Sequence, residues 1–237
     1  GAMGDLQGAL ELEERVHDVW EAHLDEGHAD LLRAKENLAG TRLAMGDPGG
    51  ARDLLEHVLE VRRRLFHVDH FGVLRAEENL AVARLELGDT DGARALLEHV
   101  RTVRGRTLPE GHKDRARADE RLAMVHLAEG DPAAARELFE RAAREFGALL
   151  PPHHPDLLRI QGSLAVARFA AGDVAAAESM VVEAAKTATG LVSYGLTASP
   201  REARALTRGV HDRLGRLRLC RDVSADSQET LARLFSA

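Results

Sequence analysis

A sequence pattern in this chain recurs every 42 residues. Each copy contains a Gly-Asp pair, with a leucine eight residues before the glycine and an alanine five residues after it. Four copies follow one another without an insertion, and their glycines are Gly46, Gly88, Gly130 and Gly172. A period of this length indicates a repeat protein, in which one small unit buries its apolar face against its neighbours.

Each 42-residue unit predicts two helices joined by a tight turn. The first pair spans residues 29–45 and 48–66, and the copies lie 42, 84 and 126 residues further on. Glycine permits the left-handed backbone that ends a helix, and aspartate is a good cap for the next one. Pro48 and Pro132 stand at the first position of the second helix, where proline is tolerated.

Leucine and alanine columns indicate how the helices pack. Alanine or isoleucine lies one turn before the leucine column, on the same helix face. Hydrophobic residues make up 44% of the chain and aromatic residues only 3%, a composition that favours closely packed helices over strands. The fold class is therefore predicted to be all-α. The two columns are Leu38, Leu80, Leu122 and Leu164, and Ala34, Ala76, Ala118 and Ile160.

The repeats resemble the tetratricopeptide repeat, in the 42-residue variety found in kinesin light chains and in many bacterial signalling proteins. The resemblance rests on the segments Glu36-Asn37-Leu38-Ala39 and Glu78-Asn79-Leu80-Ala81, on the Gly-Asp turns and on the alanine beyond each turn. It covers about residues 4–190. It implies a right-handed α-solenoid of antiparallel hairpins, with a concave groove lined by the first helices that binds a protein or peptide.

The two ends of the chain depart from the period. Residues 1–3 have the composition of a remnant left by tag removal. Gly4-Asp5 lies 42 residues before Gly46-Asp47, so residues 4–27 are predicted to hold the second helix, to about residue 24, of an incomplete repeat. This helix is either a natural cap or the edge of a longer solenoid that was cut. Residues 28–190 form four hairpins, and residues 191–237 are predicted to form irregular capping helices, at about 200–219 and 226–235.

One exposed stripe of polar residues follows the period and is the candidate groove. Arginine recurs at one position of all four first helices, and Asn, Arg or Ser follows four residues later. Asparagine can both donate to and accept from a peptide backbone, and arginine can bind a carboxylate with two parallel bonds. The alternative is a set of internal ion pairs with a glutamate three residues after three of these arginines. The stripe comprises Arg33, Asn37, Arg75, Asn79, Arg117, Arg121, Arg159 and Ser163.

Two other periodic columns have structural interpretations. Arg42, Arg84, His126 and Arg168 are predicted to pack at the seam between helices, with their stems covering apolar surface. Histidine recurs before each first helix, usually followed by aspartate two residues later. Because equivalent positions in stacked repeats are spread out, these histidines are predicted to cap helices and to hold no metal ion. They are His28, His70, His112 and His154.

Composition and motifs exclude several functions. The net charge of −7 argues against a nucleic-acid partner, and no apolar run is long enough to span a membrane. The chain has no nucleophile motif or phosphate-binding loop, so neither catalysis nor a cofactor is predicted. We predict a cytoplasmic protein- or peptide-binding module, part of a larger bacterial regulatory protein. The alternatives are a peptide-sensing receptor and a structural scaffold that self-associates through its incomplete end.

Overall fold

The computed structural model describes residues 2–152, 154–177 and 179–180, and these residues form helices and no strands. The chain divides into two compact units, residues 1–107 and 108–237. The predicted capping helices at 200–219 and 226–235 lie outside the described residues. The all-α class predicted from the repeats is confirmed for the described part of the chain.

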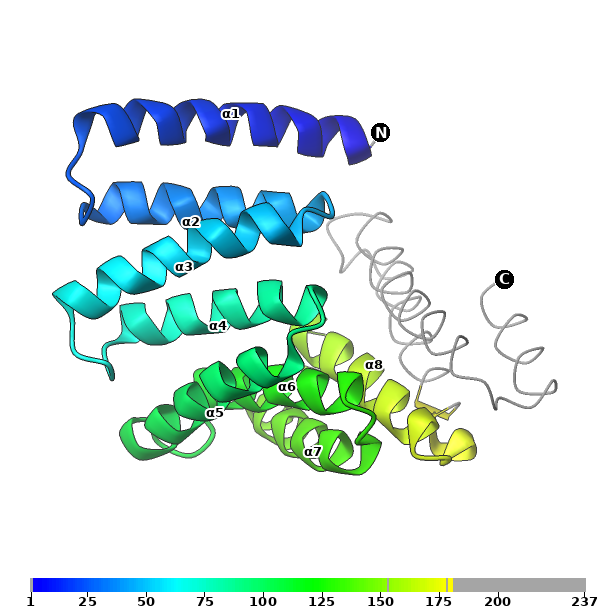
Figure 1. Ribbon diagram of the computed structural model, residues 1–237. Helices are drawn as coiled ribbons and strands as arrows, with labels where there is room; N and C mark the ends of the chain where they lie inside the picture. Colours follow the sequence, from blue (N-terminus) through cyan, green and yellow to red (C-terminus); the bar gives the residue numbers. More distant parts are fainter. Residues whose placement is uncertain (1, 153, 178, 181–237) are drawn as a thin grey trace. The chain divides into compact units, whose positions relative to one another are not determined.

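The first unit contains five helices, and each of α1 to α4 packs against the helix that follows it in the sequence (Figure 1). Helix α1 packs against α2, the pair α2 and α3 forms one hairpin, and the pair α4 and α5 forms the next. Helix α3 also packs against α4, so neighbouring hairpins share an interface. The helices are α1 (Ala2–His23), α2 (Ala29–Ala44), α3 (Pro48–Leu65), α4 (Phe71–Glu86) and α5 (Thr90–Thr107).

The second unit repeats this arrangement. Helices α6 (Lys113–Ala128) and α7 (Pro132–Leu149) form a hairpin, and α7 also packs against α8 (Pro155–Ala170). All seven helices from α2 to α8 begin at the predicted residue and end one residue earlier than predicted. The period therefore locates the helices in both units.

Gly-Asp pairs form the turn inside each hairpin. Gly46 has a φ of 82°, and Asp47 donates its backbone N–H to the carbonyl of Arg42 at 2.9 Å. The carboxylate of Asp47 then accepts from the N–H of Gly50 at 2.9 Å and caps α3. The same two hydrogen bonds recur at Asp89, Asp131 and Asp173. One dipeptide thus ends one helix and begins the next.

Histidines cap the first helix of every hairpin, as predicted. In each case the ring nitrogen Nδ1 accepts from the backbone N–H two residues later, at 3.1 to 3.2 Å. The cap survives at His70, where Gly72 replaces the usual aspartate, because the donor belongs to the backbone. An accepting Nδ1 means that the neutral ring carries its proton on Nε2.

The leucine and alanine columns lie in the interior, where every member of both columns is at most 5% exposed. Ala39, Ala51, Leu55 and Val58 are buried in the core of the first unit, together with residues of α4. Ala123, Ala135, Phe139 and Leu164 form the equivalent cluster in the second unit. Alanine at the closest contacts lets neighbouring helices approach, and the larger side chains fill the space beside them.

The start of the chain differs from the prediction in one respect. Gly4-Asp5 is in register with the turns, yet both residues lie inside α1, which begins at Ala2. The helix predicted within residues 4–27 is therefore α1, and it begins two residues before the Gly-Asp pair.

The histidine caps should contribute measurably to stability. His28→Ala is expected to lower the free energy of unfolding by about 0.5–2 kcal/mol, the usual cost of losing an N-cap. His28→Asn supplies another side-chain acceptor and should retain most of the stability. Urea unfolding followed by circular dichroism measures both variants. Equal losses in the two variants would show that the ring contributes through packing and not through the cap.

Candidate functional site

Helices α2 and α4 present the predicted stripe on the surface of the first unit. Arg33 and Asn37 are exposed on α2, while Arg75 is exposed and Asn79 half-buried on α4. The side chains of Arg33 and Arg75 are 61% and 50% exposed. In the first unit, therefore, both hairpins offer an arginine and an asparagine that a partner can reach.

A buried carboxylate anchors the second arginine of this stripe. Glu36 of α2 accepts two parallel bonds from Arg62 of α3, at 2.7 and 2.8 Å, and both side chains are almost fully buried. Arg75 of α4 donates to the same carboxylate at 2.6 Å, and Asn79 lies 3.4 Å from it. Arg62 also donates to the backbone carbonyl of Gly72 at 2.8 Å. The carboxylate of Glu36 thus joins α2, α3 and α4.

The partner of Arg75 is not the one expected from the sequence. The predicted alternative paired such an arginine with the glutamate three residues later, whereas Arg75 contacts a glutamate 39 residues earlier, in the preceding hairpin. Arg33 likewise pairs with Asp30, three residues before it, at 2.7 Å. Stacking of hairpins brings Glu36 next to α4, and sequence spacing within one helix gives no indication of this contact.

The arginines of α3 and α5 were missed by sequence reasoning. Arg104 makes the same buried two-bond contact with Glu78, at 2.6 and 2.7 Å. Arg62 and Arg104 are one period apart, as are Glu36 and Glu78, so the shared period was a usable signal. The equivalent residues one period before Arg62 and one period after Arg104 are Trp20 and Phe146. Because arginine occupies only two of these four positions, the column is hard to recognise in the sequence.

In the second unit the stripe residues are less accessible. Arg117 and Arg121 are half-buried on α6. Arg159 of α8 forms ion pairs with the buried Glu120 of α6 and with Asp156. Ser163 is buried, and its hydroxyl donates to the backbone carbonyl of Arg159 at 3.2 Å. The features suited to an incoming peptide are therefore concentrated on α2 and α4.

The arginines of the column Arg42, Arg84, His126 and Arg168 lie at the seam between helices, as predicted. Each arginine there forms an ion pair with a glutamate 28 residues earlier, on the preceding helix. The side chains of these arginines are about 30% exposed, and their carboxylate partners lie on another helix, where the pattern within one helix does not reveal them. The pairs are Arg42 with Glu14 at 3.5 Å, Arg84 with Glu56 at 2.9 Å, and Arg168 with Glu140 at 2.9 Å.

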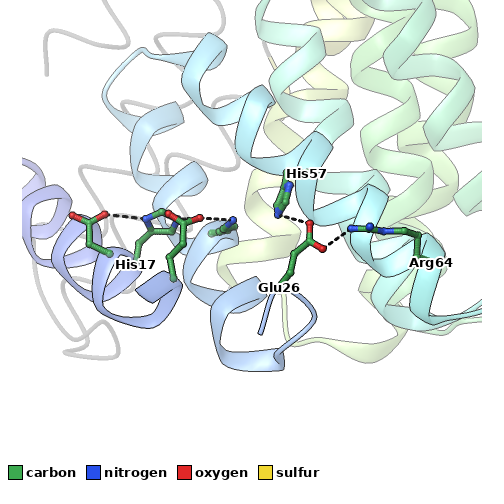
Figure 2. A network of polar contacts seen from close by, with 7 residues as sticks. His17, Glu26, His57 and Arg64 are labelled. Carbon is green, nitrogen blue, oxygen red and sulfur yellow. Dashed lines mark hydrogen bonds and ion pairs between the residues drawn. The ribbon is translucent and has the colours of Figure 1, made fainter. Parts of the chain in front are cut away.

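Another set of ion pairs joins the first helix of a hairpin to the helix before it, and the two charges exchange places from one repeat to the next. Lys35 of α2 binds Glu21 of α1 at 3.0 Å, and the Lys35 contact lowers the pKa of Glu21. One period later the buried residue is Glu77, which binds Arg63 at 2.7 Å with the opposite polarity. The α1–α2 and α3–α4 interfaces of the first unit therefore carry opposite charge patterns, which disfavours mispairing of their helices. Figure 2 shows the ion pairs of Glu26 with His57 and Arg64 in the same unit.

The architecture and this set of contacts define a class of protein, the helical-hairpin solenoids that act as protein–protein interaction modules. A tetratricopeptide-repeat sequence profile matches residues 1–64, 30–106 and 114–189. The chain belongs to the tetratricopeptide repeat family. This fold is typically a non-enzymatic interaction scaffold, and no curated protein matches the chain in sequence.

Solved structures agree with this assignment. Two are crystal structures from Podosopora anserina, of a protein described as a kinesin light chain with nearly identical TPR-like repeats. The first is 27% identical, covers 83% of this chain and 91% of its own, and gives a TM-score of 0.65. A Rap protein complexed with competence and sporulation factor is 12% identical over 99% of this chain and 70% of its own, with a TM-score of 0.68. It shares the fold.

The residues that the structure describes contain no group of three or more His, Cys, Asp or Glu side chains that could hold a metal ion. None of the described helices combines the length and the apolar character needed to cross a lipid bilayer.

The buried pair between Glu36 and Arg62 yields a stability prediction. Arg62→Met leaves the Glu36 carboxylate with fewer partners in the interior and should cost about 3–5 kcal/mol of unfolding free energy. The double variant Glu36→Met/Arg62→Met should recover much of this loss, because no buried charge remains. Arg84→Ala, at the more exposed pair with Glu56, should cost about 1 kcal/mol or less. Urea unfolding distinguishes these outcomes, and a harmless Arg62→Met would contradict the proposed role of the carboxylate.

Glu145 of α7 occupies the position that holds Val61 in α3 and Val103 in α5. Burial raises the pKa of this carboxyl, and the nearby Asp119 raises it further. A raised pKa in the folded state means that the stability is highest below the ordinary pKa of a glutamate and falls as the pH rises through the raised value.

Glu145→Gln should therefore stabilise the protein at pH 7, and this gain should disappear below about pH 4. Glu145→Val should stabilise it further at pH 7, because valine restores the apolar residue of the other repeats. Thermal unfolding as a function of pH measures both variants. A Glu145→Gln variant that is no more stable than the wild type at pH 7 would contradict the interpretation.

Proposed function

We propose that this chain recognises an extended peptide segment of a partner protein along the stripe that Arg33, Asn37, Arg75 and Asn79 form on the first helices. The observation that carries the proposal is the repetition of an accessible arginine and asparagine at equivalent positions of α2 and α4. Equivalent residues on successive hairpins suit a ligand that is itself repetitive, such as a peptide backbone.

The chemistry of the stripe favours an acidic segment or a free carboxylate. The Arg75 guanidinium is held on one side by Glu36 while half of the side chain remains exposed. Such an anchored arginine loses less conformational entropy when it binds a second carboxylate. The asparagines can donate to and accept from the backbone of the same peptide.

The stripe of the second unit, Arg117, Arg121, Arg159 and Ser163, belongs to the same proposal as a candidate binding surface of that unit. We place the module in the cytoplasm, within a larger bacterial regulatory protein. Peptide sensing and structural self-association are the competing functions. A partner peptide that shifts the conformation of the chain would favour sensing, and concentration-dependent assembly without any partner would favour a scaffold.

The test begins with a pull-down of partner proteins by the full chain, followed by mapping of the bound segment with overlapping peptides. Arg33→Ala and Arg75→Ala should each weaken binding of that segment about tenfold, since a hydrogen bond to a charged group contributes about 1.5–3 kcal/mol. Isothermal titration calorimetry measures the affinities. Arg33→Ala is the cleaner test, because Arg33 pairs with the solvent-accessible Asp30, whereas Arg75 and Arg159 also pair with the buried carboxylates of Glu36 and Glu120.

Arg52→Ala serves as the matched control, because Arg52 is a surface arginine of α3 that pairs locally with Asp53 and lies outside the stripe. It should bind with the affinity of the wild type. Full affinity in both Arg33→Ala and Arg75→Ala, with normal folding, would assign the arginines to internal ion pairs and move the binding surface elsewhere.

A further inference from the structure

Helix α4 begins with an aromatic residue that the repeat fold does not require. Phe71 is 73% exposed, and Phe66 and Val68 in the preceding loop are 41% and 47% exposed. None of the residues equivalent to Phe71 in the other first helices is aromatic, so the hairpin forms without a ring at this position. Neighbouring exposed apolar residues that the fold does not require indicate a contact surface. The equivalent residues are Ala29, Lys113 and Pro155.

The imidazole of His70 supports the ring of Phe71. Its centroid lies 4.2 Å from that of the Phe66 ring, with the planes 9° apart, and 4.5 Å from that of the Phe71 ring, with the planes 41° apart. The backbone N–H of Gly72 donates to Nδ1 of His70, and this hydrogen bond fixes the orientation of the imidazole. The three rings form a preorganised apolar platform, which loses little conformational entropy when a ligand side chain packs on it.

The platform lies on the same face of α4 as the proposed peptide-binding stripe. Phe71, Arg75 and Asn79 are spaced by four residues, which places their side chains one turn apart on one helix face. Cβ atoms in this relation are about 5–6 Å apart. A ligand that binds Arg75 can therefore also reach the ring of Phe71.

The residue after Phe71 also distinguishes α4 from the other first helices. That position holds an aspartate in α2, α6 and α8, and in α2 its carboxylate pairs with Arg33, three residues later, at 2.7 Å. Helix α4 has Gly72 there and no acidic residue in its first turn. Arg75 thus has no aspartate three residues before it, where a carboxylate would compete with that of a ligand. The aspartates are Asp30, Asp114 and Asp156.

We infer that Phe71, Gly72 and Arg75 form a subsite that recognises an apolar side chain and a carboxylate two residues apart in an extended ligand. The inference rests on the proposed function and deepens it by naming the sequence pattern of the partner segment. Residues i and i+2 of an extended peptide project to the same side, about 6.6 Å apart, and this distance matches one turn of α4. The apolar side chain packs on the ring of Phe71, and the carboxylate binds Arg75.

The experiment measures binding of labelled peptides to the full chain by fluorescence anisotropy. The probes are short peptides of glycine and serine that carry one leucine and one glutamate, either adjacent or two residues apart, in both orders. One of the two probes with the wider spacing should bind saturably and about tenfold more tightly than the adjacent probes, since only it buries the leucine while the glutamate binds Arg75. Control probes with serine in place of the leucine or the glutamate should bind as weakly as the adjacent probes.

Phe71→Ala tests the apolar half of the subsite, and alanine is the residue that begins α2. This variant should bind the leucine probe about tenfold more weakly than the wild type. The probe without leucine should bind both proteins equally, which assigns the loss to contact between the two apolar groups. Leu87→Ala is the matched control, because Leu87 is an exposed apolar residue directly after the C-terminal end of α4. It should leave the affinity unchanged, and circular dichroism checks that both variants remain folded.

Gly72→Asp tests the acidic half, because it restores the aspartate of the other first helices. It should weaken binding of the leucine–glutamate probe about two- to fivefold, since the new carboxylate pairs with Arg75 as Asp30 pairs with Arg33. Gly72→Asn has the same shape without the charge and should bind like the wild type. A Cβ atom at residue 72 would lie 3.2 Å from Nδ1 of His70, so the comparison of the two variants separates the effect of charge from a displacement of the ring.

The results distinguish a failure of the subsite from a failure of the stripe. If the mapped partner segment depends on Arg33 but neither it nor the probes depend on Phe71, the inference is wrong and the proposed function stands. If Phe71→Ala weakens binding while Arg33→Ala and Arg75→Ala do not, the platform is unconnected with the stripe, and both are wrong. Absence of saturable binding of every probe, or equal affinity for adjacent and spaced probes, would also overturn the inference.

Discussion

A buried carboxylate on the first helix of a hairpin organises the contacts between repeats. Glu36 receives Arg62 from its own hairpin and Arg75 from the next one, so a single side chain fixes three helices. A carboxylate is costly to bury unless charged or polar groups surround it. The helices around Glu36 must therefore adopt the one arrangement that satisfies it, and apolar packing alone would tolerate other alignments.

Under the proposed function, this ionic arrangement would also connect stability with recognition. Arg75 is at once a partner of the buried Glu36 and an exposed residue of the proposed binding stripe. A ligand carboxylate at Arg75 would act on the same guanidinium that links two hairpins. In repeat proteins, where each unit contacts only its neighbours, such a link couples ligand binding to the interface between adjacent units.

The repeats are similar in backbone and different in charge. The turns and the histidine caps recur with nearly constant hydrogen-bond lengths, because they depend on the backbone and on one side chain each. By contrast, the pair Lys35–Glu21 becomes Glu77–Arg63 in the next repeat, and Arg62 and Arg104 give way to Phe146. Constant turns preserve the fold, while variable interfaces give each pair of neighbours its own specificity.

The sequence by itself determined the helices, the turns and the caps of this protein. Those features depend on local chemistry, such as a left-handed glycine followed by aspartate, so a 42-residue period located them to within one residue. The partners of the charged residues were decided only by the tertiary structure. Arg75 finds Glu36 39 residues away because two hairpins stack, and no spacing within one helix encodes that contact.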